Sequence, residues 1–139
     1  MKKSMPRTVA FLVALIILVS SSTAFAASSV SGQSSGGSAG IANCSGRVTV
    51  SQGGVFTNDS ATAYTSADAT GTYVVTAFVW YNDGTSEKSK KETKSVNNCS
   101  AQISVTCEGP NDYGNKGTGG HTYYSSIRGS WTGGTTKSF

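Results

Sequence analysis

The chain has 139 residues, of which 17 are glycine, 13% are charged and 37% are hydrophobic. This length allows one small domain, and so little charge excludes a long charged helix or a highly charged disordered tail. A composition rich in glycine, serine and threonine favours short strands joined by tight turns.

The first 26 residues have the pattern of a bacterial secretory signal peptide. Basic residues near the N-terminus precede an apolar run over 9–19, and the small residues around Ala26 are typical of a cleavage site. As a helix, the apolar run would rise about 16 Å, roughly half of what a membrane requires. We therefore predict that residues 1–26 are removed, that the protein is secreted and that no membrane span remains.

Removal of this segment changes the charge of the protein. Three of the eleven basic residues lie in it, so eight basic residues remain against seven acidic ones. A nearly neutral protein lacks the positive field that attracts nucleic acids. We therefore expect no nucleic-acid partner.

Residues 27–42 consist mostly of serine, glycine and alanine. Such a segment has little to bury, and it predicts a flexible tether before a single domain over 43–139. The segment matches the G-x-S-x-G nucleophile motif twice, around Ser34 and Ser38. Because no apolar strand precedes these serines and no helical pattern follows them, we discard both as nucleophiles.

Hydrophobic alternation with a period of two begins after the tether. It predicts half-buried strands over 47–51, 60–66 and 101–107. Residues 72–81 are apolar on both faces, which predicts a strand in the middle of a sheet or beneath a second layer.

A hairpin is predicted to follow the central strand. The sequence Asn82-Asp83-Gly84 is a strong tight-turn signal, and a lysine-rich segment over 87–96 comes next. Opposite charges four positions apart would also suit a helix there. The segment has no apolar stripe, however, so we favour a solvated edge strand whose lysines discourage pairing with other sheets.

The C-terminal part is predicted to form a Gly-rich loop over 108–120, a strand over 121–131, a turn at 133–134 and a last strand over 135–139. In total we expect an all-β fold: a small β-sandwich or partly open barrel of about six or seven antiparallel strands. A short internal repeat relates 43–50 to 98–105. Duplication into two similar half-units and coincidence both remain open.

The three cysteines are an odd number for an exported chain. A straight strand over 99–107 would hold Cys99 and Cys107 about 26 Å apart, too far for a disulfide. An up-and-down strand order brings Cys44 and Cys99 to the same end of the sheet. We therefore predict a Cys44–Cys99 disulfide, which would contribute about 4 kcal/mol. The alternative is that all three cysteines stay reduced.

Cys107 then has three interpretations: a buried hydrophobic residue, a thiol that links two chains, or a nucleophile. Its alternation with Ile103 and Val105 favours the first. A nucleophile would need His121 as its base. Because the chain has one histidine and its acidic residues are scattered, we predict no metal site, no cofactor and no acid/base pair.

Aromatic residues are the remaining candidates for function. We expect Tyr73, Trp80 and Trp131 to lie in the core. Tyr113 and Tyr124 fall at positions predicted to be exposed, and a strand face that carries them among hydroxyl groups and Arg128 would stack on sugar rings or seat a protein partner. The predicted binding residues are Tyr113, Tyr124 and Arg128.

These features favour a secreted, non-enzymatic β-sandwich that acts as an extracellular interaction module for a cell-envelope polymer, a glycan or a protein. One alternative is a secreted antimicrobial, bacteriocin-like or toxin-like protein, for which small size, export and a Gly-rich chain are ordinary. The other is a secreted enzyme that uses Cys107 and His121. No motif in the chain is specific enough to indicate a family.

Overall fold

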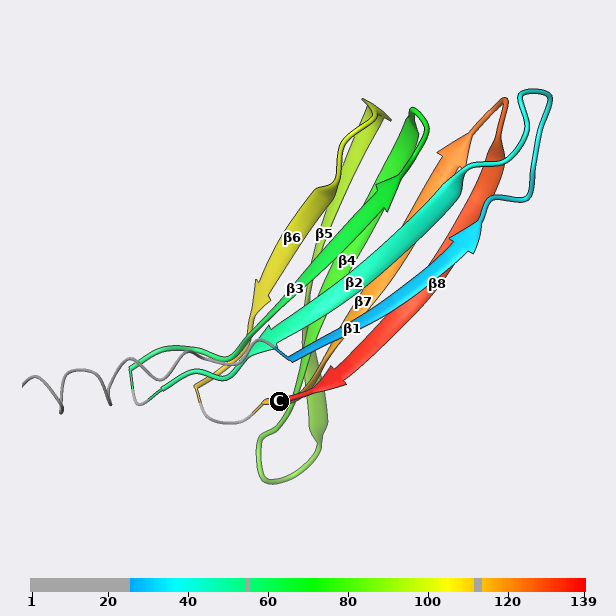
Figure 1. The fold of residues 1–139 in the computed structure, drawn as a ribbon. Helices are drawn as coiled ribbons and strands as arrows, with labels where there is room; N and C mark the ends of the chain where they lie inside the picture. Colours follow the sequence, from blue (N-terminus) through cyan, green and yellow to red (C-terminus); the bar gives the residue numbers. More distant parts are fainter. Residues whose placement is uncertain (1–25, 55, 112–113) are drawn as a thin grey trace, which may run out of the picture.

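The computed structural model describes residues 26–54, 56–111 and 114–139, and the predicted signal peptide lies outside them except for Ala26. Eight antiparallel strands form two four-stranded sheets that pack face to face (Figure 1). Sheet I has the order β1-β2-β3-β6, and sheet II has the order β5-β4-β7-β8. The strands are β1 (Ala26–Gln33), β2 (Asn43–Ser51), β3 (Ser60–Ala67), β4 (Gly71–Asn82), β5 (Glu87–Cys99), β6 (Ile103–Glu108), β7 (Gly114–Ser125) and β8 (Gly129–Ser138). The predicted all-β sandwich is confirmed, with eight strands among the described residues.

The first part of the predicted tether is a strand. β1 pairs with β2 along its whole length, from Ala26 opposite Val50 to Gln33 opposite Asn43. The composition of β1 does not indicate a strand. Backbone hydrogen bonds hold β1 in the sheet, and its main apolar contact with the core is made by the half-buried Val30. The small residues are needed for packing, since a Cβ on Gly32 would overlap the Trp131 indole. The prediction of a flexible tether over 27–42 is therefore wrong for this strand.

The core lies between the two sheets and draws most heavily on β4. This strand pairs with β5 on one side and β7 on the other, which confirms its predicted place in the middle of a sheet. Alternate side chains on β4 are fully buried, and those between them are half-buried on the outer face of sheet II. The fully buried residues of β4 are Tyr73, Val75, Ala77 and Val79.

β5 is the predicted edge strand, and nearly all of its 13 residues are exposed. The register places four of its charged residues on the side that continues the core face of β4. Charges that point inward at a sheet edge prevent another strand from joining there. These residues are Lys88, Lys90, Glu92 and Lys94, opposite Tyr81, Val79, Ala77 and Val75.

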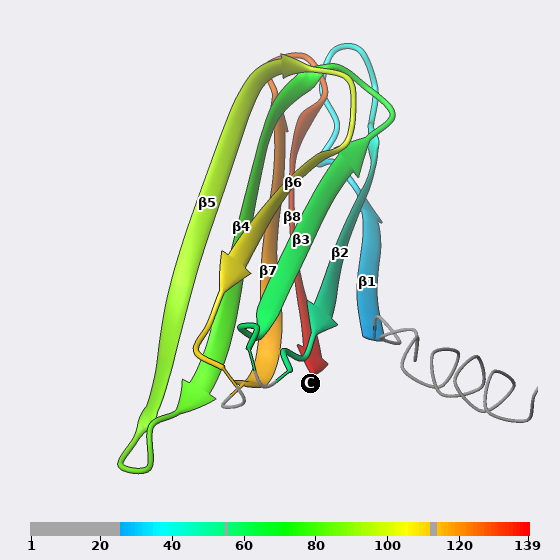
Figure 2. The same ribbon diagram turned by 90° about the vertical axis from the view of Figure 1, so that its left-hand side faces the viewer.

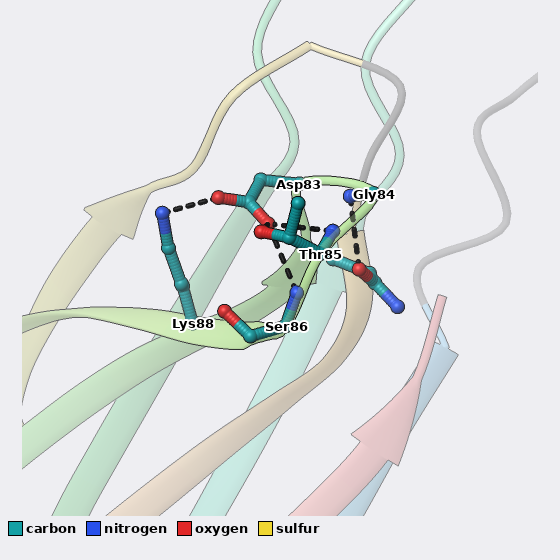
Figure 3. Close-up of polar contacts among 6 residues, drawn as sticks. Asp83, Gly84, Thr85, Ser86 and Lys88 are labelled. Carbon is teal, nitrogen blue, oxygen red and sulfur yellow. Dashed lines mark hydrogen bonds and ion pairs between the residues drawn. The ribbon is translucent and has the colours of Figure 1, made fainter.

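The hairpin between β4 and β5 extends beyond the other strands at its end of the sandwich (Figure 2), and side chains of the turn close it (Figure 3). Asn82 Oδ1 accepts a hydrogen bond from the Gly84 amide at 3.0 Å, and Gly84 has the positive φ of 92° that this turn requires. Asp83 accepts the amides of Thr85 and Ser86 and pairs with Lys88. These contacts hold the pKa of Asp83 far below its usual range, and the predicted turn is confirmed.

The predicted boundaries in the C-terminal part are wrong. Glycines of the expected loop over 108–120 lie inside β7, and Gly133 and Gly134 lie inside β8. The chain turns instead at 126–128, just before Gly129, whose φ is 79°. The strand glycines mark close packing rather than turns, since a Cβ on Gly117 would come within 2.8 Å of the Ala61 Cβ.

The segment over 98–105 also differs from the prediction. β5 ends at Cys99 and β6 begins at Ile103 in the opposite sheet, so 99–107 is not one straight strand. The related segment 43–50 lies entirely within β2. The two copies of the short repeat therefore adopt different structures and do not mark two similar half-units.

In the described part of the chain, no helix is long and apolar enough to cross a membrane.

Candidate binding site

The structure describes two of the three predicted binding residues, Tyr124 and Arg128. Tyr124 lies near the end of β7 on the outer face of sheet II and is 54% exposed. Arg128 donates from Nη1 to the Ile41 carbonyl at 3.0 Å, so it braces the loop between β1 and β2. Tyr113 lies outside the described residues. Of the two described residues, Tyr124 is the more exposed.

A shallow pocket of about 300 Å³ adjoins Tyr124 at the end of the sandwich where β3 joins β4 and β7 turns into β8. We call it the Tyr124 pocket. None of the residues that line it is charged, and most offer a hydroxyl or an amide group. The lining residues are Thr70, Gly71, Thr72, Asn98, Tyr124, Ser125, Ser126 and Ile127.

A β-bulge places Asn98 at this pocket. Gly71 lies opposite Cys99 and Tyr73 lies opposite Val96, so two residues of β5 face Thr72 alone. Asn98 has a φ of 50°, a left-handed conformation that asparagine tolerates better than most residues. Bulges commonly redirect a side chain beside a functional site. Sequence reasoning missed Asn98, although its asparagine pair before a cysteine is a weak signal for such a bend.

Two more aromatic residues lie on the same outer face. Phe78 and Trp80 are half-buried on β4, with ring centroids 6.2 Å apart and planes 26° from parallel. Trp80 Nε1 donates to Thr118 Oγ1 at 3.0 Å, and Lys116 Nζ lies 5.0 Å from the Trp80 ring centroid. The prediction that Trp80 belongs to the core is therefore wrong, whereas Tyr73 and Trp131 are buried as predicted. We call the two outward rings the Phe78–Trp80 pair.

The structure does not bring Cys107 and His121 together. Both ring nitrogens of the buried His121 are engaged by hydroxyls, Nδ1 by Thr65 at 3.0 Å and Nε2 by Thr135 at 2.8 Å. Cys107 lies opposite Ala61 on β3. Ala61 and Thr65 are four positions apart on this strand, which at the rise of a β-strand separates them by about 13 Å. Burial also raises the pKa of the Cys107 thiol, which opposes its use as a nucleophile.

No three His, Cys, Asp or Glu side chains within the described ranges gather where they could hold a metal ion. All three cysteines are free, so the predicted Cys44–Cys99 disulfide is not formed in the structure. Cys44 is on β2, which packs on β7 and β8, whereas Cys99 is on β5, which packs on β6. Cys44 lies near the start of β2 and Cys99 at the end of β5.

We expect alkylation to distinguish the three thiols. Burial, together with the nearby charge of Asp68, raises the pKa of Cys44 from 9.0 to about 11. At pH 8 Cys44 therefore has roughly a hundredfold less reactive thiolate than an ordinary thiol. Iodoacetamide followed by peptide mass spectrometry should label Cys99, which is half-buried, well before Cys44 and Cys107. Recovery of a Cys44–Cys99 linked peptide before reduction would contradict this assignment.

Comparison with known proteins finds no family model that matches the chain, no matching curated protein and no matching solved structure. A function for this protein therefore rests on the chemistry of the Tyr124 pocket and of the sheet face beside it.

Proposed function

We propose that the protein is a secreted bacterial binding module without enzymatic activity, and that its ligand is a neutral glycan of the cell envelope or its surroundings. The observation that carries this proposal is the Tyr124 pocket, an uncharged, hydroxyl-lined hollow beside an exposed aromatic ring. The signal-like pattern of residues 1–26 supports export.

The lining of the pocket suits a sugar. The face of an aromatic ring packs against the apolar side of a sugar ring, while hydroxyls and amides exchange hydrogen bonds with its hydroxyl groups. The Asn98 amide can both donate and accept, and the hydroxyls of Thr70 and Ser125 can rotate to do either. A charged ligand would find no opposite charge among the lining residues, so a neutral one is favoured.

The site is also held in place before any ligand arrives. Thr72 Oγ1 donates to Asn97 Oδ1 at 3.1 Å across the bulge. A Cβ on Gly71 would come within 2.6 Å of the Tyr124 carbonyl oxygen, so glycine allows β4 to approach β7 closely here. A pocket that needs little reordering loses less free energy when it binds.

Removal of the Tyr124 ring should weaken glycan binding about tenfold, as expected for an aromatic residue at the centre of a small site. The purified protein would be incubated with insoluble cellulose, chitin and peptidoglycan, and the bound fraction measured after centrifugation. We expect the protein to sediment with at least one of these polymers and Tyr124→Ala to remain mostly in solution. The matched control is Tyr64→Ala, which removes a tyrosine from the outer face of sheet I.

Asn98→Gly provides a second variant, which removes a single polar side chain from the pocket. Glycine adopts the left-handed backbone of the bulge without strain, so the change removes the side-chain amide and leaves the bulge intact. Binding should weaken while the melting temperature is retained. The proposal fails if the wild-type protein stays in solution with all three polymers, or if both Tyr124→Ala and Asn98→Gly bind as the wild type does.

A further inference from the structure

We infer that the outer face of sheet II is a track for an extended polysaccharide, which runs along β4 from the Tyr124 pocket to the Phe78–Trp80 pair. This inference rests on the proposed function and names its ligand more closely. The ligand would be a neutral, linear polymer such as a β-1,4-linked glucan or N-acetylglucosamine polymer, rather than a single terminal sugar.

The two aromatic sites lie on one line. Tyr124 pairs with Thr72 at the start of β4, and Trp80 lies eight positions further along the same strand. At the rise of a β-strand this separation is about 26 Å. Because Thr72 and Trp80 differ by an even number of positions, both side chains emerge on the outer face.

The path between the two sites is uncharged. The outward residues of β4 there are Val74 and Thr76, and Thr76 shares a hydrogen bond of 3.0 Å with Thr93 of β5. Charges on this face lie near the Phe78–Trp80 pair: Lys91 lies opposite Phe78, and Lys116 is paired with Glu87 at 3.3 Å. The neighbouring outward residues of β7 are Thr118, Gly120 and Thr122.

Two glycines leave the middle of this path without side chains on the outer face. Gly120 of β7 lies between Thr76 of β4 and Gly134 of β8 in the sheet register. A Cβ on Gly120 would be 3.7 Å from the Thr76 Cβ, an ordinary contact, so packing does not require glycine here. Its lack of a side chain instead leaves room for a chain that lies over the sheet.

The Phe78–Trp80 pair is fixed in orientation. The Trp80 N–H is already bound to Thr118, so this indole offers a ligand its ring, beside Lys116 Nζ at 5.0 Å from the ring centroid. Ordered rings lose little entropy when a ligand packs on them. A polymer that reaches both aromatic sites gains from the second site because its effective concentration there is high.

Affinity for short and long oligosaccharides tests the inference. Isothermal titration with cellobiose, cellohexaose, chitobiose and chitohexaose should show that the wild-type protein binds a hexasaccharide at least tenfold more tightly than its disaccharide. Trp80→Ala should reduce this preference by about tenfold. Gly120→Gln, which places a side chain in the path, should do the same without disturbing the fold. The matched control is again Tyr64→Ala, and melting temperatures check that each variant is folded.

The outcomes separate the two proposals. If Tyr124→Ala weakens binding while Trp80→Ala and Gly120→Gln leave hexasaccharide affinity unchanged, the pocket binds a short glycan and the track is refuted. If neither Tyr124→Ala nor Trp80→Ala changes affinity for any of the four probes, both the track and the proposed function are wrong.

Discussion

We expect Tyr73→Ala to lower the free energy of unfolding by about 3–5 kcal/mol, a large share of the 5–15 kcal/mol typical of a small domain. The Tyr73 side chain is fully buried, and its ring meets Tyr123 edge to face at a centroid distance of 5.6 Å. Its hydroxyl donates to the Ala69 carbonyl at 2.8 Å, beside that of Ala67 at 3.1 Å. The truncation leaves a cavity between the sheets and removes both kinds of contact. Urea denaturation measures the loss.

Tyr73→Phe separates the hydroxyl from the ring, and it should cost only about 1 kcal/mol. Tyr64 provides the comparison outside the core, because it is half-buried beneath Arg47, whose guanidinium carbon lies 4.5 Å from the ring centroid. If Tyr73→Ala costs no more than Tyr64→Ala, then Tyr73 does not lie between two packed sheets and the sandwich described above is wrong.

The protein should lose stability as the pH falls below about 6.5, the ordinary pKa of histidine. Burial lowers the pKa of His121 in the folded protein. The unfolded chain therefore takes up a proton at a higher pH than the folded protein does. The contribution of neutral His121 is complete above the unfolded pKa and is lost as the pH falls toward the lowered folded pKa. Urea midpoints between pH 8 and pH 5 measure this dependence.

The surroundings of His121 give this prediction its control. Thr65 and Thr135 are its neutral hydrogen-bond partners, and a Cβ on Gly119 would come within 2.8 Å of its Nε2. His121→Gln should make stability nearly independent of pH in this window, whatever it costs at pH 8. The pKa of Asp68 is lowered from 3.8, so Asp68 is protonated only below the range from pH 8 to pH 5. A wild-type protein equally stable at pH 8 and pH 5 would refute the buried, neutral His121.

Features that depend on side-chain alternation could be predicted from the sequence. The division of β4 into two faces, the charged edge strand β5 and the turn at Asn82-Asp83-Gly84 all follow local rules of strand and turn formation. β1 could not be predicted in this way. It is held by backbone hydrogen bonds to β2, which leave no mark on its composition.

Glycines were the main source of wrong boundaries. Gly117 and Gly133 resemble turn residues in the sequence, but they lie in strands where neighbouring side chains occupy the space of a Cβ. The straight strand assumed over 99–107 was wrong for another reason. The chain passes from β5 to β6 in the opposite sheet, and this crossing is not visible locally.

The candidate site was predicted in part. Tyr124 was expected to be exposed on a strand face, and it is. Arg128 was also predicted, and its contact with the carbonyl of Ile41, 87 positions away, could not be read from the sequence. Trp80 was assigned to the core because its strand is apolar on both faces, and periodicity alone does not say which face is covered.

Chemical-shift mapping by NMR with cellohexaose and chitohexaose tests most directly whether the outer face of sheet II is the binding surface. The largest amide shifts should follow β4 and β7, from Thr72 and Tyr124 past Gly120 to Trp80. Shifts confined to the outer face of sheet I, around Tyr64, or no shifts with either oligosaccharide, would contradict it.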